Sequence, residues 1–352
     1  MNVPASDPLP ATRRLARRRW GDLALTALLA TWLGWLAYRL VRWGVLDATW
    51  TADDITGCQA RDGACWAFVR DKARLIFFGL YPYEQQWRAA LATALVIVLF
   101  AATAIPRLRR PALAYAWLAS AALATALLRG GFAGLAPVET DRWGGLPLTL
   151  LLATVGLALA FPLGVILALA RTSELPVPRV LATAYVELVR GVPLVTVLFM
   201  ASVMVPLFLP PGWNLDKLVR AQIGIVLFAA AYLAEVVRGG LNTVPRGQLE
   251  AARAMGFGYL GTMRFVVMPQ ALRAVVPPLV NTAIGLFKDT SLVVVIGLLD
   301  LTNAAKSAMS DPRWLGAVLE GYVVVGAVYF AFCFALSKLS RTLEISPRDA
   351  AS

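Results

Sequence analysis

The sequence predicts an all-α membrane protein with about eight transmembrane helices, of which the last five form a distinct core. Hydrophobic residues make up 59% of the 352 residues and charged residues only 15%, whereas soluble domains are about half apolar and a quarter charged. Eight apolar runs are close to the ~20 residues that a helix needs to cross a hydrocarbon core about 30 Å thick. The loops on one side of these runs are rich in arginine, as in cytosolic loops of membrane proteins.

The eight runs are rich in Leu, Ala and Val and are bounded by charged residues or proline. They cover residues 22–41, 89–105, 112–128, 146–170, 180–206, 219–237, 274–298 and 314–336. The second and third runs have 17 residues each, so a tilted or partly interfacial helix is an open alternative for both.

The positions of the arginines predict the orientation of the chain. Basic clusters precede the first run, fill the turn after the second and follow the sixth; they are Arg13, Arg14, Arg17, Arg18 and Arg19, then Arg107, Arg109 and Arg110, then Arg238, Arg246, Arg253, Arg264 and Arg273. With eight spans, both termini are expected in the cytosol. The net charge of +12 follows from this topology, and nucleic-acid binding is not expected. The first run lacks a small-x-small cleavage site and is interpreted as a retained helix.

Two of the three cysteines, Cys58 and Cys65, lie in the loop assigned to the outside of the membrane. An oxidising compartment permits a disulfide between them, but the sequence does not decide whether they pair. Cys333 is expected to pack in the last helix. Because the chain has no histidine, a metal site is not expected.

The chain divides into a front and a core. The predicted parts are a basic cytosolic terminus (1–20), a three-helix extension (21–141) with an external loop (42–88), a five-helix domain (142–340) with a cytosolic loop (238–273), and a cytosolic tail (341–352). No internal repeat and no phosphate-binding Gly-x-x-x-x-Gly-Lys-Ser/Thr loop occurs in the sequence. If ATP drives the process, a partner must hydrolyse it, and no cofactor is expected on this chain.

The long cytosolic loop is predicted to contain a short helix. Pro245 favours a helix start, residues 248–255 are mostly helix formers, and Gly256 ends the helix. Ala251, Ala252 and Ala254 are expected to be exposed beside Glu250. Pro269 either stops a second short helix or begins the next one. On these grounds alone, a docking helix and an ordinary amphipathic surface helix are equally supported.

The string Glu250-Ala251-Ala252, Gly256 and Val266-x-Met268-Pro269 resembles the EAA loop of ABC importer permeases. Two conservative departures occur, at Val266 and Met268. Further segments resemble the polar amino-acid branch of that family: Leu188-Val189-Arg190-Gly191-Val192-Pro193-Leu194, Tyr232-Leu233-Ala234-Glu235-Val236-Val237-Arg238-Gly239-Gly240 and Phe287-Lys288-Asp289-Thr290-Ser291-Leu292. The front resembles the M subunit of general L-amino-acid importers.

The resemblance implies a multi-pass permease of the bacterial inner membrane that has no enzymatic activity and carries L-amino acids. In that family the loop forms coupling helices that sit on the ATPase, so Glu250, Ala251, Ala252, Gly256 and Pro269 are the expected coupling residues. The implied partners are an ABC ATPase dimer that uses the ATP, a second permease in a heterodimer, and a periplasmic amino-acid-binding protein.

Charged residues within membrane spans are costly and mark functional sites. Lys288 and Asp289 lie about 15 residues, ~22 Å, into the seventh run. Glu187 and Arg190 share one helical face of the fifth run, before a predicted kink at Gly191 and Pro193. All six are candidates for the substrate path, and ion pairs that fix helix packing are the alternative. Glu235 and Arg238 are expected either to brace the cytosolic loop or to form an interfacial salt bridge.

Two rival functions differ in class. An ion-coupled secondary amino-acid transporter that acts without an ATPase agrees with the membrane charges but not with the missing repeats or the loop. A membrane-bound enzyme or receptor scaffold is disfavoured, because the sequence contains no histidine, no metal-ligand cluster and no nucleophile constellation.

Overall fold

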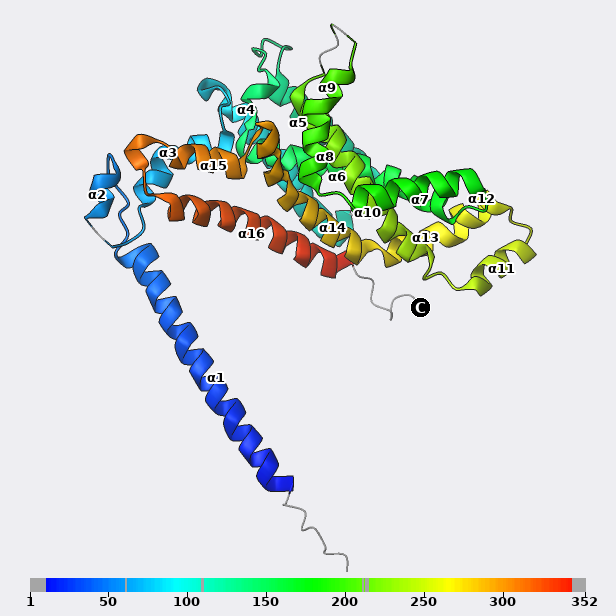
Figure 1. Cartoon of the computed structure of the whole chain (residues 1–352), viewed down its shortest axis with the longest axis horizontal. Coiled ribbons are helices and arrows are strands. Elements are labelled where there is room, and N and C mark those ends of the chain that lie inside the picture. The colour runs from blue at the N-terminus through cyan, green and yellow to red at the C-terminus, as the bar shows by residue number, and fades with distance from the viewer. Residues whose placement is uncertain (1–10, 61, 109–110, 211, 213–214, 344–352) are drawn as a thin grey trace, which may run out of the picture. The chain divides into compact units, whose positions relative to one another are not determined.

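The structure is a computed structural model that describes residues 11–60, 62–108, 111–210, 212 and 215–343. The chain forms two compact units, of which the first comprises Met1–Asp71 with Pro312–Glu320 and the second Lys72–Asp311 with Gly321–Ser352. Helices dominate both units, as predicted (Figure 1).

The first unit is a small folded lobe after a long helix. Its elements are α1 (Ala11–Val41), the π-helix η1 (Arg42–Leu46), α2 (Ile55–Gln59), the start of α3 (Trp66–Phe78) and η8 (Pro312–Trp314). Cys58 and Cys65 are joined by a disulfide, with their Cα atoms 5.5 Å apart. The backbone N–H of Cys65 donates to the buried carboxylate of Glu320 at 2.8 Å. The lobe therefore ties the loop after α1 to a segment that lies more than 250 residues later.

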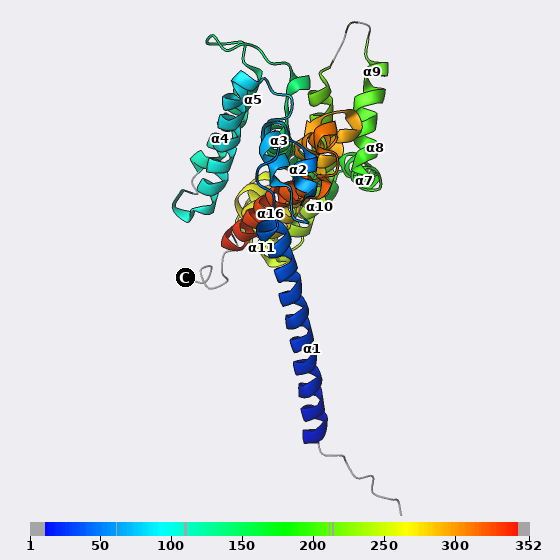
Figure 2. The same cartoon turned by 90° about the vertical axis from the view of Figure 1, so that its left-hand side faces the viewer.

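The second unit contains the remaining helices. Their order is η2 (Tyr83–Gln85), α4 (Gln86–Ala104), η3 (Pro106–Leu108), α5 (Pro111–Arg129), η4 (Thr140–Arg142), α6 (Gly145–Thr172), α7 (Pro176–Arg190), α8 (Leu194–Phe199), η5 (Met200–Met204), α9 (Val205–Phe208), α10 (Lys217–Leu241), α11 (Arg246–Ala254), α12 (Tyr259–Gly261), η6 (Thr262–Val267), α13 (Met268–Ala274), α14 (Val276–Asp289), η7 (Thr290–Ile296), β1 (Leu299–Asp300) and α15 (Leu301–Met309), followed by α16 (Val318–Leu343), which begins in the first unit. Figure 2 shows α4 and α5 side by side as a hairpin.

The centre of the second unit is the packed pair α6 and α10. Small residues at Gly156, Ala160 and Gly164 recur every four residues and are buried on one face of α6. A Cβ atom at Gly164 would lie 2.7 Å from the Cβ of Leu233 in α10. Small residues at this spacing let two membrane helices approach closely.

Among the described residues, six helical segments are long and apolar enough to cross a membrane. They are Asp22–Leu46, Tyr83–Ala104, Gly145–Thr172, Lys217–Leu241, Val276–Ile296 and Val318–Arg341. A bent pair, Pro176–Arg190 with Leu194–Phe208, raises the number to seven. The predicted number of eight spans is therefore only approximate. The difference lies in part in the run 112–128, which forms the 19-residue helix α5 but is not among these spans.

The fifth predicted run is broken rather than merely bent. The axes of α7 and the helix that begins at Leu194 differ by 104°, and the break falls at the predicted Gly191 and Pro193. Because proline cannot donate a backbone hydrogen bond and clashes with the preceding turn, the sequence ends one helix here and starts another. The kink prediction is confirmed, and α7 packs against α6 and α10.

Candidate functional site

The loop between α10 and α14 presents a short helix, α11 (Arg246–Ala254), as predicted. Pro245 precedes it with an extended backbone, and Gly256 follows it in the left-handed region with φ of +84°. The N–H of Phe257 donates to the carbonyl of Ala252 at 3.1 Å, which satisfies a carbonyl at the helix end. Gly256 thus ends the helix by the mechanism that its sequence position predicts.

The chain after Gly256 returns to the membrane bundle through α12, η6 and α13. Pro269 lies in the first turn of α13, so it begins the next helix and does not stop the previous one. Val244, Val267 and Ala271 are buried together beneath the loop. This small apolar cluster holds α11 against the end of α10.

The exposed surface of the loop differs in part from the prediction. Glu250 and Ala251 are exposed, but Ala252 is only 3% exposed. The expectation that Ala252 is available for contact is wrong, because this side chain faces the rest of the loop. Met255 and Leu260 are 77% and 80% exposed, and neither was singled out from the sequence.

A cluster of charged side chains lies where α6, α7 and α10 end. Glu235 accepts from Arg171 at 2.7 Å, pairs with Arg190 at 3.5 Å and pairs with Arg238. Arg171 also donates to Glu187 at 2.9 Å. The Glu235 carboxylate and the Arg171 guanidinium therefore join α6, α7 and α10.

This geometry changes the interpretation of Glu187 and Arg190. The two residues do not neutralise each other, because Glu187 pairs with Arg171 and Arg190 pairs with Glu235. Arg171 is the second-last residue of α6, so the cluster lies at the end of the spans and not part of the way across. Sequence reasoning missed Arg171, although a basic residue in the last turn of a span was a usable signal.

Lys288 and Asp289 lie elsewhere, at the junction of α14 and the 3₁₀ segment η7. Lys288 is exposed and Asp289 is half-buried, and neither makes an ion pair with another described residue. Lys288 is ~18 Å along α14 from its start. The six predicted path residues therefore divide into two separate groups.

Among the described residues, six or seven apolar helical spans and an exposed helix in the loop after α10 are typical of a polytopic membrane protein. The family described as the binding-protein-dependent transport system inner membrane component matches residues 160–344. The chain belongs to this family. The predicted resemblance to ABC importer permeases is confirmed.

Relatives of the chain include proteins that match the front as well as the core. The inner membrane amino-acid ABC transporter permease protein YhdY of Escherichia coli (strain K12) is 46% identical over 92% of this chain and 89% of its own length. The glutamate/glutamine/aspartate/asparagine transport system permease protein BztC of Rhodobacter capsulatus is 36% identical over the same shares. A crystal structure of an amino acid ABC transporter with histidines is 32% identical, covers 57% of this chain and 91% of that chain, and has a TM-score of 0.51.

Proposed function

We propose that the chain is the permease subunit of an ABC importer that carries L-amino acids across the inner membrane. The proposal rests first on the exposed helix α11, which follows a span and is held in place by its own buried cluster. Membership of the binding-protein-dependent family and the printed names of its relatives support the same function.

In this proposal, α11 docks on an ATPase dimer that binds and hydrolyses the ATP. Glu250 and Ala251 face the ATPase, and Met255 and Leu260 add exposed apolar contacts. A few residues that become fully desolvated dominate the affinity of such interfaces. Ala252, Gly256 and Pro269 act indirectly, since they fix the shape of the loop.

The substrate path is proposed to include Lys288 and Asp289, because charges without an ion pair in a span can meet the charged ends of an amino acid. Gly191 and Pro193 form the elbow between α7 and α8. Glu187 and Arg190 contribute to this path through the position of the elbow, and Glu235 and Arg238 brace the loop that carries α11.

The remaining partners and the topology follow from the same proposal. A second permease completes a heterodimer, and an external binding protein delivers the amino acid. Both termini lie in the cytosol, as does α11, because arginines cluster before the first span and in the loop of α11, as in cytosolic segments. Two spans of the described chain separate this loop from the C-terminus.

The test is uptake of radiolabelled L-glutamate and L-glutamine into proteoliposomes that contain the assembled transporter and its binding protein. Uptake is expected only with enclosed ATP, and uptake driven by an ion gradient alone would contradict the proposal. Met255→Asp with Leu260→Asp should remove the ATPase from the purified complex. Leu315→Asp, at a residue that is also exposed but distant in sequence from the loop, is the control and should retain it.

A further inference from the structure

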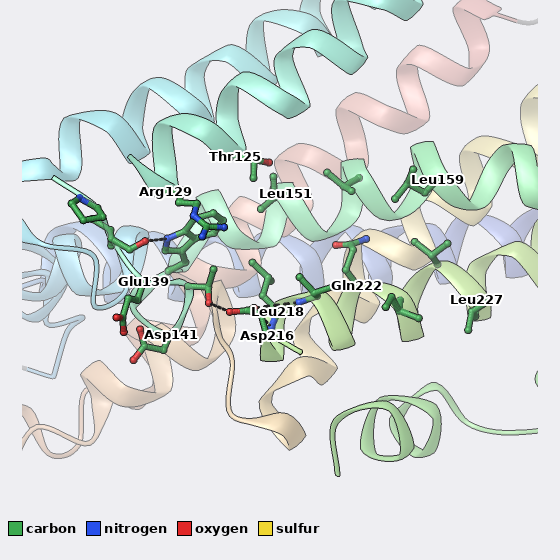
Figure 3. A pocket seen from close by; sticks show the side chains of 18 of the residues that line it. Thr125, Arg129, Glu139, Asp141, Leu151, Leu159, Asp216, Leu218, Gln222 and Leu227 are labelled. Carbon is green, nitrogen blue, oxygen red and sulfur yellow. Dashed lines mark hydrogen bonds between the residues drawn. The ribbon is translucent and has the colours of Figure 1, made fainter. Parts of the chain in front are cut away.

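A groove of about 1100 Å³ runs along α6 and α10 and is bordered by the end of α5 and the segment 137–143 (Figure 3). It lies away from α11 in the sequence and contains none of the residues assigned to coupling or to the substrate path. Its apolar residues and its charged residues occupy different parts of the groove, which points to an amphiphilic ligand.

The long wall of the groove is apolar. On α6, Leu151, Val155, Leu159 and Leu163 recur every four residues and therefore lie in one row. Leu227 of α10 lies opposite the far part of this row (Figure 3). The row from Leu151 to Leu163 is ~18 Å long at 1.5 Å per residue, close to the ~15 Å of one leaflet in a ~30 Å hydrocarbon core.

The charged residues gather at one end, where α5 ends and α6 and α10 begin (Figure 3). Arg129 is the last residue of α5, and Glu139 and Asp141 lie in the connection to α6. Among the described side chains, none forms a salt bridge with these three. Asp216 is already engaged, since it caps α10 and accepts from the hydroxyl of Thr140.

We propose that this groove binds a phospholipid with a zwitterionic ammonium headgroup, of the phosphatidylethanolamine class. The acyl chains lie along the leucine row, Arg129 binds the phosphate, and Glu139 and Asp141 accept hydrogen bonds from the ammonium group. An ammonium has three N–H donors for these carboxylates, whereas the two negative charges oppose an anionic headgroup. An apolar helix from another subunit would leave all three charges without a partner.

The experiment measures the lipids that remain bound to the assembled transporter after detergent washing, by native mass spectrometry. The complex is first reconstituted with equal amounts of palmitoyl-oleoyl phosphatidylethanolamine and phosphatidylglycerol. The wild type should retain phosphatidylethanolamine with about fivefold preference, the factor that roughly one surface charge contributes. Absence of retained lipid, or equal retention of both lipids, would overturn the proposal.

Matched variants locate the bound lipid. Glu139→Gln with Asp141→Asn should remove the preference. Arg129→Gln should lower the retention of both lipids, because both carry a phosphate, whereas Arg107→Gln, at an exposed arginine outside the groove, should change neither retention nor preference. Leu159→Trp should expel the lipid, and Leu91→Trp should not, although the two leucines are 48% and 49% exposed. If the Leu159→Trp variant fails to fold, the variants at Arg129, Glu139 and Asp141 test the proposal without it. A Leu159→Cys crosslink to another protein chain would also refute the lipid assignment.

Discussion

Glu235 neutralises guanidinium groups from two other helices and from its own helix, so its substitution is the sharpest test at the scale of a single residue. Glu235→Gln keeps the shape of the side chain but removes its charge. Partly exposed ion pairs are worth about 0.5 kcal/mol each, so the loss of three pairs, about 1.5 kcal/mol, is expected to lower ATP-dependent uptake ~tenfold. The measurement is initial uptake rate at equal amounts of assembled transporter.

The control for this variant is Glu174→Gln, at an exposed carboxylate just after α6 for which the structure gives no ion pair among the described residues. It should leave uptake unchanged. Full uptake by the Glu235→Gln variant would contradict the proposal that Glu235 braces the loop that carries α11. Loss of the assembled complex in Glu235→Gln would instead assign the cluster to folding.

The charged cluster also shows what sequence can predict about single residues. Glu235 and Arg238 are three residues apart on one helix, and this local spacing predicts their contact. Arg171 is 64 residues from Glu235 and 16 from Glu187. Its partners depend on how α7 turns back against α6 after Thr172 and on how α6 packs on α10, and no local pattern gives these directions.

At the scale of elements, the close contact of α6 and α10 predicts a strong effect of side-chain size. Gly164→Ala would place a Cβ atom 2.7 Å from Leu233 and 3.1 Å from the backbone of Ala234. Because backbone atoms cannot move aside cheaply, a loss of about 1–3 kcal/mol of stability is expected. The measurement is the Tm of the purified protein in detergent.

Gly285→Ala is the matched control, since Gly285 also lies inside a spanning helix but has open space where a Cβ would be built. Its Tm should stay the same or rise, because alanine favours helix by about 0.5–1 kcal/mol over glycine. Equal Tm changes for the two variants would contradict the close packing of α6 on α10.

The end of α11 gives a second prediction for an element. Gly256 has φ of +84° and no atoms within 4 Å of a built Cβ, so Gly256→Ala tests the backbone conformation alone. A left-handed alanine costs about 1–2 kcal/mol. We expect weaker co-purification of the ATPase, measured by quantitative pull-down.

Gly247→Ala lies in the first turn of the same helix, at a position with open space and no left-handed backbone. It should bind the ATPase like the wild type. If Gly256→Ala also binds normally, the left-handed turn is not needed for docking.

Elements with local signals were predictable, and elements shaped by distant contacts were less so. The helix α11 and its end were predicted from a run of helix formers between Pro245 and Gly256. The position of the break after α7 was predicted from Gly191 and Pro193. The burial of Ala252 was not predictable, because it depends on the return of the chain through η6 and α13. The change from α14 to the 3₁₀ segment η7 at Thr290 had no recognised sequence signal.

At the scale of the whole chain, the matches differ in the share of the chain that they cover. The two relatives named for Escherichia coli and Rhodobacter capsulatus match 92% of the chain, whereas the solved amino acid transporter covers 57% of it and is itself 91% covered. That protein therefore has no counterpart for about two fifths of this chain. The hairpin of α4 and α5 packs on α6 through small residues, including Ala92 and Ala124, and its removal would expose apolar surface to lipid.

Lipid tails solvate such a surface well, because no hydrophobic driving force separates apolar helices from the bilayer. A chain that begins at residue 142 is therefore expected to insert, to assemble with its partners and to retain ATP-dependent uptake, with a lower Tm than the full chain. The measurements are co-purification of the ATPase, uptake in proteoliposomes and thermal unfolding of the purified complex. A truncated chain that assembles but transports nothing would assign the front a direct part in translocation, and a chain that fails to assemble would make the α4–α5 hairpin part of the permease fold.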